Sequence, residues 1–224
     1  MHAYLYTDND QMRPILEGDT DARKAIDASL EEVNMMIAGI LYRPFRVMAN
    51  NIRSVKSPAD LKGVAVRSPL PPPTWQSLRR WRQPHHHQLE RGVHLHAAGA
   101  CDGVENAITE LVSINLQEAT KYVSETNHMA SPIPILISKS WYDGLDASQQ
   151  EAIMKAGTET TDWRAQNVKD EEASAWQAFA DAGAECLRMD DIDFAAFQES
   201  CKDVYKQFVE EGYFTEEFYD SLKG

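Results

Sequence analysis

The stretch Ser57-Pro58-Ala59-Asp60-Leu61-Lys62-Gly63-Val64-Ala65-Val66-Arg67 holds two structural signals in a row. Ser57 suits a helix N-cap, Pro58 suits the first helical position, and Gly63 suits the stop. The apolar residues after Gly63 predict a short buried strand that ends in the charge of Arg67. A helical turn that leads directly into a buried strand is typical of an α/β protein.

The rest of the chain continues this alternation of helices and strands. Helical spacing of apolar residues predicts helices over 19–38 and 103–125, and strands are expected at 39–48, 133–138 and 184–189. Asp146 and Gln149 form a capping box that opens a periodic stretch reaching Gly183, far longer than an ordinary helix. Two further helices are expected, one after Asp193 and one at 215–223.

Composition narrows the class of protein. The formal net charge is −13, which repels nucleic acid and anionic membrane surfaces, and no apolar run is long enough to be inserted in a membrane. The first residues lack the basic and apolar regions of a signal peptide, so we expect an N-terminally truncated fragment. Three cysteines without a C-x-x-C spacing argue against a zinc finger, although a Cys186–Cys201 bridge is possible.

Residues 67–99 interrupt the alternation of predicted helices and strands. They hold five of the ten prolines, five of the seven histidines and five basic residues against one acid. The histidine cluster His85–His96 could bind a metal, or a basic arm with Trp75 and Trp81 could bind nucleic acid. A third interpretation is a frameshift over about 68–99. One permitted codon choice for 84–99, shifted by one nucleotide, reads Pro-Thr-Thr-Ile-Ser-Trp-Asn-Glu-Val-Tyr-Thr-Ser-Met-Gln-Gln, a plausible amphipathic helix start. We favour the frameshift.

That recovered text, followed by Cys101-Asp102-Gly103-Val104-Glu105-Asn106, resembles a hallmark of the solute-binding proteins of TRAP (tripartite ATP-independent periplasmic) transporters, the dicarboxylate-binding DctP-like family. Three more stretches resemble family motifs at suitable separation: Ser57 to Arg67, Lys121-Tyr122 to Asn127-His128, and Ser140 to Leu145. Together the motifs span most of residues 14–210.

The resemblance implies a type II periplasmic-binding-protein fold, an α/β architecture of two lobes and a hinge with a long helix that spans both. We expect residues 1–66 to be a remnant of an incomplete first lobe and hinge, and residues 67–138 to form lobe two. Residues 139–224 would supply the long spanning helix and C-terminal helices that pack on both lobes.

The resemblance also implies a function. The family captures a small organic carboxylate in the periplasm and delivers it to the membrane permease subunits, with no enzyme activity and no cofactor. The alternative is a metal-dependent hydrolase that uses the His85–His96 cluster.

The family's carboxylate-binding arginine corresponds to Arg67, whose guanidinium fork matches a carboxylate. The resemblance assigns further ligand contacts to Asn106 and to Arg46, with Arg43 as a rival for Arg46. The family's R-V-P becomes Arg67-Ser68-Pro69 here, and the pocket-wall residues that follow are altered. We therefore expect a chain that is marginally stable or unfolded and that binds ligand weakly if at all.

Overall fold

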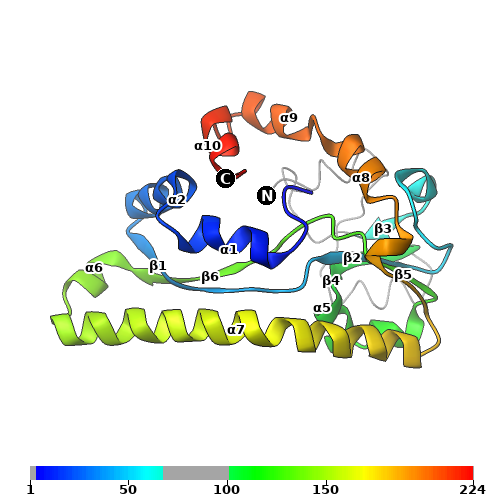
Figure 1. The fold of residues 1–224 in the computed structure, drawn as a ribbon, viewed down its shortest axis with the longest axis horizontal. Coiled ribbons are helices and arrows are strands. Elements are labelled where there is room, and N and C mark those ends of the chain that lie inside the picture. The colour runs from blue at the N-terminus through cyan, green and yellow to red at the C-terminus, as the bar shows by residue number, and fades with distance from the viewer. Residues whose placement is uncertain (1–3, 68–100, 224) are drawn as a thin grey trace.

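Two β-sheets joined by one long helix organise the chain in the computed structural model, which describes residues 4–67 and 101–223 (Figure 1). The smaller sheet pairs β1 (Met35–Leu41) with β6 (Ile133–Ser138), antiparallel. The larger sheet has the strand order β3-β4-β2-β5-β7. The alternation of helices and strands confirms the predicted α/β class.

The smaller sheet is covered by α1 (Asn9–Glu17) and α2 (Asp21–Glu32), which share a buried apolar cluster with β1. The helix predicted over 19–38 is too long, because α2 ends at Glu32 and the chain turns at Asn34, whose φ is +59°. Asparagine tolerates this left-handed conformation. The apolar residues after the turn extend and pair with β6 instead of continuing the helix.

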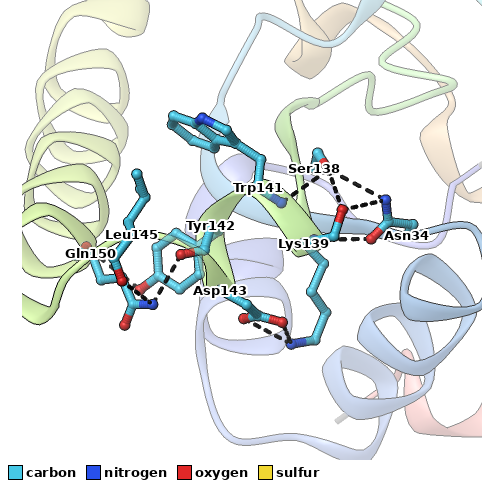
Figure 2. A network of polar contacts seen from close by, with 9 residues as sticks. Asn34, Ser138, Lys139, Trp141, Tyr142, Asp143, Leu145 and Gln150 are labelled. Carbon is cyan, nitrogen blue, oxygen red and sulfur yellow. Dashed lines mark hydrogen bonds and ion pairs between the residues drawn. The ribbon is translucent and has the colours of Figure 1, made fainter.

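The turn at Asn34 is fastened to the end of β6 by a network of polar contacts (Figure 2). The Asn34 side chain accepts a hydrogen bond from the Ser140 N–H (2.9 Å) and donates to the Ser138 and Ser140 hydroxyls. The backbone carbonyl oxygen of Asn34 accepts a hydrogen bond from the Lys139 N–H at 3.0 Å. These contacts fix where β6 gives way to α6 (Lys139–Asp143).

The larger sheet contains β2 (Arg46–Asn50), β3 (Val66–Arg67), β4 (Gly103–Ala107), β5 (Tyr122–Ser124) and β7 (Glu185–Leu187). A short 3-10 turn, Pro58–Leu61, precedes β3 as predicted. The helix predicted over 103–125 is wrong: this stretch forms β4, then α5 (Ile108–Ser113), a 3-10 turn and β5. All five residues of β4 are buried between β2 and β3, so pairing on both edges overrides the helical spacing.

Each face of the larger sheet is covered by helices. Met48 and Val66 pack with α8 (Phe194–Cys201) and α9 (Val204–Glu210) on one face, while Val47 and Val104 pack with α5 and α7 (Ala147–Asp181) on the other. Cys201 belongs to the first face and Cys186 to the second, so the possible bridge between them is not formed.

The helix α7 connects the two sheets. Its 35 residues correspond to about 50 Å at 1.5 Å per residue, and it runs the full length of the molecule (Figure 1). Asp146 and Gln149 form the predicted capping box. Near β1 the helix approaches the strand backbone through Gly157, and the Thr161 hydroxyl accepts a hydrogen bond from the Ile40 N–H at 2.8 Å. The predicted long spanning helix is present.

The C-terminal helices close the upper side of the molecule (Figure 1). From the larger sheet, α8 and α9 lead back to α10 (Glu216–Ser221) near α2, and the Tyr6 hydroxyl donates to the Leu222 carbonyl oxygen at 2.8 Å. The larger sheet draws strands from both sides of the expected boundaries at 66/67 and 138/139. The division into lobes stays a prediction. None of the helices in the described part has the length and apolarity to cross a bilayer.

Candidate functional site

The three predicted ligand-binding residues lie on three neighbouring strands of the larger sheet. Arg46 begins β2, Arg67 ends β3, and Asn106 lies in β4 between them. The strand register pairs Arg46 with Ala107, Val47 with Asn106, and Arg67 with Val104. All three side chains are buried, with at most 5% of the residue surface exposed.

Arg46 is held by a buried acid and a buried histidine. Its Nε donates to Oε2 of Glu105 at 2.5 Å, and its Nη2 donates to the Glu105 carbonyl oxygen at 3.0 Å. The same Oε2 atom lies 3.2 Å from Nε2 of His128, and the His128 Nδ1 lies 2.8 Å from the Thr126 hydroxyl. The result is a continuous hydrogen-bonded network that fixes the direction of the Arg46 guanidinium.

Glu105 carries a negative charge throughout the physiological range. Complete burial raises the pKa of its carboxyl, but the charge of Arg46 and the hydrogen bond from His128 outweigh burial and lower the pKa to about 2. Because Glu105 is ionised, Nε2 of His128 carries the hydrogen in their contact. Burial of such a pair is tolerated only because each charge meets its partner at close range.

The side chains of Asn106 and Arg67 lie on the face of the larger sheet opposite to that of Glu105. Val104 packs on the face that α7 covers, whereas Met48, which pairs with Glu105, packs on the opposite face. Because side chains alternate between faces along β4, Asn106 lies on the Val104 face and Glu105 on the Met48 face. The Asn106 Oδ1 accepts from the Ala107 N–H at 2.9 Å, which leaves the NH₂ end to donate elsewhere. A ligand that contacts all three predicted residues must therefore lie across the strand ends.

Sequence reasoning assigned no role to Glu105, His128 or Thr126. Each belongs to a stretch quoted for the resemblance, and two of them are separated by a single residue, Asn127. Arg46 could have indicated Glu105, because an arginine that is buried in a sheet needs a buried acid as its partner. The chain supplies that acid at Glu105, directly before Asn106.

Two other predictions concern charged or metal-binding residues. Arg43, the rival of Arg46, lies outside the Arg46 network and pairs with Glu110 on α5, with Nη2 to Oε1 at 3.0 Å. The His85–His96 cluster and the presumed frameshift over 68–99 lie outside the described residues. Within 4–67 and 101–223, no three His, Cys, Asp or Glu side chains are grouped closely enough to hold a metal ion.

Comparison with known proteins gives a family match over almost the whole chain. Residues 1–212 match the DctP model, described as bacterial extracellular solute-binding protein, family 7. The 2,3-diketo-L-gulonate-binding periplasmic protein YiaO of Escherichia coli K12 is 24% identical over 214 residues, covering 93% of this chain and 64% of YiaO. The C4-dicarboxylate-binding periplasmic protein DctP of Rhodobacter capsulatus is 29% identical over 113 residues, half of this chain and 34% of DctP.

Solved structures agree with the fold. A TRAP periplasmic solute-binding protein from Sulfitobacter with bound β-D-galacturonate has a TM-score of 0.86 at 25% identity, covering 99% of this chain and 71% of that one. Another, from Chromohalobacter salexigens with bound D-glucuronate, has a TM-score of 0.89 at 22% identity, covering 99% and 72%. The fold is thus the periplasmic-binding-protein fold, and the chain spans less than two thirds of the length of YiaO.

The family match extends over far more than half of the chain, and the resemblance read from the motifs is confirmed by it. The buried arginine, acid and histidine described above lie inside the matched range. The chain belongs to the DctP family of TRAP solute-binding proteins, family 7 of the bacterial extracellular solute-binding proteins.

Proposed function

We propose that this chain is the solute-binding component of a TRAP transporter and that it captures a small organic carboxylate at the ends of β2, β3 and β4. The observation that carries the proposal is the Arg46 guanidinium, 4% exposed and fixed by Glu105. A guanidinium has five N–H groups, and the described contacts of Arg46 use two of them. The remaining N–H groups are suited to a carboxylate oxygen.

The candidate site favours an anion because the Glu105 charge is already matched. Glu105 neutralises Arg46, and the buried guanidinium of Arg67 adds a second positive charge at the strand ends. Asn106 adds a neutral donor for a second oxygen. A planar, bidentate arginine contact discriminates carboxylates from neutral solutes by geometry as well as charge.

The class of acid follows from the relatives by analogy. The neighbouring structures are named for bound galacturonate, glucuronate and D-erythronate, all of which join a carboxylate to several hydroxyl groups. A hydroxylated acid of this size is the first candidate for this chain. The proposed partners are the membrane permease subunits of the transporter, and the proposed location is the periplasm, as in the names of YiaO and DctP.

We further propose that binding is the whole activity and that the chain catalyses no reaction. The family consists of solute-binding proteins. The buried Glu105 and His128 hold each other and Arg46, so they serve as a support for the guanidinium in this proposal.

A thermal-shift panel tests the proposed function. The purified chain is heated with D-glucuronate, D-galacturonate, D-erythronate or succinate, and with D-glucose as the uncharged control. At least one acid is expected to raise the melting temperature in a saturable way, because a ligand that binds only the folded state stabilises it. Melting temperatures that no acid raises, or that glucose raises equally, would contradict the proposal.

A further inference from the structure

The segment that carries His128 has an unusual conformation. Residues 125–128 are buried, with 0–7% of each residue exposed, although all four are polar. Asn127 has a φ of +40°, in the left-handed region that non-glycine residues rarely adopt. A conformation of this kind persists only where the surroundings hold it in place.

Glu125 fastens this segment to the far strand of the sheet. Its N–H donates to the Leu187 carbonyl oxygen at 2.9 Å. Its Oε2 atom accepts hydrogen bonds from the Arg188 Nε at 2.7 Å and from the Met189 N–H at 3.1 Å. The other carboxylate oxygen receives a long contact of 3.5 Å from the Asn127 amide. The Glu125 side chain therefore links Asn127 to the end of β7.

Arg188 extends the link to the long helix. Its guanidinium lies 4.5 Å from the centre of the Trp176 ring, and Trp176 is a buried residue of α7. A cation over a tryptophan face is attracted by the ring electrons. Glu125, Arg188 and Trp176 thus connect α7 to the segment 125–128. His128, at the end of this segment, contacts Glu105.

We propose that Glu125 and Arg188 are positioning residues for the candidate anion site. They hold Asn127 in its left-handed turn, which aims Nε2 of His128 at Glu105 and so keeps the Arg46 guanidinium oriented toward the ligand. Arg188 touches neither Arg46 nor a ligand and acts only through this sequence of contacts. The inference rests on the proposed function for its consequence in ligand binding, but the orientation of His128 can be measured without a ligand.

The test is the His128 imidazole N–H resonance in the ligand-free, histidine-labelled protein, identified by its loss in His128→Gln. In Arg188→Gln and in Glu125→Gln this resonance is expected to broaden or move, because the ring no longer keeps a single orientation. Arg188→Lys should restore part of it, since the charge opposite Glu125 returns. A melting curve of each variant accompanies the spectrum.

Arg13→Gln is the matched control. Arg13 also pairs with a carboxylate, Glu17 at 2.8 Å, and also lies over an aromatic ring, Tyr42 at 5.7 Å, but it contacts none of the residues around His128. Its loss should leave the His128 resonance in place. If Arg188→Gln does not fold, the resonance in Glu125→Gln decides the test. This variant leaves no buried carboxylate without its arginine, and the glutamine oxygen can still accept from the Met189 N–H.

A His128 resonance that is unchanged in the folded variants of Glu125 and Arg188 overturns the proposal. Where wild type binds an acid, Arg188→Gln should bind the same acid about tenfold more weakly at unchanged stoichiometry, by analogy with metal sites, where loss of the hydrogen-bond partner behind a ligand weakens metal binding. If wild type binds no acid, the proposed function fails, while the resonance still decides the positioning role.

Discussion

Arg67 ends the shortest strand of the larger sheet and is 1% exposed. Replacing it with alanine removes the proposed anchor of the ligand carboxylate, so Arg67→Ala should weaken acid binding by about 3 kcal/mol, the cost of leaving a charged group unpaired. Arg67→Lys should recover little of this, because a lysine lacks the planar fork. Calorimetric titration with the best acid of the panel measures both. Arg43→Ala is the control, and equal losses in it and in Arg67→Ala would count against the assignment.

Glu105 gives a pH prediction. Its folded-state pKa is lowered to about 2 from the ordinary value of 4.5, so the network stabilises the fold fully above pH 4.5. That contribution should fall as the pH drops from 4.5 toward 2. Glu105→Gln should lose about 3 kcal/mol of unfolding free energy at neutral pH by stranding Arg46, and the difference from wild type should shrink through this window.

Urea unfolding at a series of pH values measures that difference. Glu110→Gln is the matched control: Glu110 is the acid partner of Arg43, and the Glu110 side chain is 40% exposed. It should change the unfolding free energy much less than Glu105→Gln at neutral pH, because solvent reaches the Glu110 side of this pair. A Glu105→Gln difference that stays constant from pH 7 to pH 2 would show that the network does not titrate as described.

Sequence reasoning proposed Arg46, Arg67 and Asn106 as ligand contacts, which stays a prediction, and the fold places them on adjacent strands. It did not identify Glu105 or His128, because their role depends on pairing between β2 and β4 and on the buried segment after β5. Neither contact has a local signature. From the sequence alone, a charged residue that binds a ligand cannot be distinguished from one that supports a ligand-binding residue.

At the scale of elements, α7 was predictable and β4 was not. The capping box at Asp146 and an uninterrupted helical period depend only on neighbours within a turn or two of the helix. The strand at 103–107 is determined by partners far away in sequence, namely 46–50 and 66–67. Its apolar residues, together with those of α5, imitate a helical period.

The contact between α7 and β1 gives a prediction for Gly157. A Cβ atom built there would lie 1.8 Å from the Ala38 carbonyl oxygen, too close for the helix and strand to keep their separation. Gly157→Ala should therefore destabilise the fold by about 1–3 kcal/mol, although alanine is the better helix former. Thermal or urea unfolding measures the change. The exposed neighbour Thr158→Ala should be neutral or slightly stabilising, and a stabilised Gly157→Ala would refute the close approach.

At the scale of the whole molecule, β6 is a strand that exposes apolar side chains. It is a run of apolar residues, yet Ile133 is 45% exposed and Leu136 is 39% exposed. Within 4–67 and 101–223, β6 pairs only with β1. Continuous apolar strands are ordinarily covered on both faces, and an uncovered edge promotes association.

We therefore expect the chain to self-associate through this edge at high concentration. Ile133→Lys should reduce association, because a charge on an edge strand opposes pairing with a second copy. Ile52→Lys is the matched control, since Ile52 is also 45% exposed but lies outside both sheets. Sedimentation velocity over a range of concentrations measures the effect. Equal effects of the two substitutions, or a strictly monomeric wild type, would contradict this expectation.

The central claim is that the chain recognises the negative charge of a small organic acid. The most direct measurement compares, by calorimetry, the acid that raises the melting temperature most with its neutral primary amide, which has nearly the same shape. The acid should bind one per chain, and the amide should bind about a hundredfold more weakly, because a neutral amide cannot accept the two charge-assisted hydrogen bonds that a guanidinium donates to a carboxylate. Equal affinity for acid and amide, or no binding of either, would contradict the account.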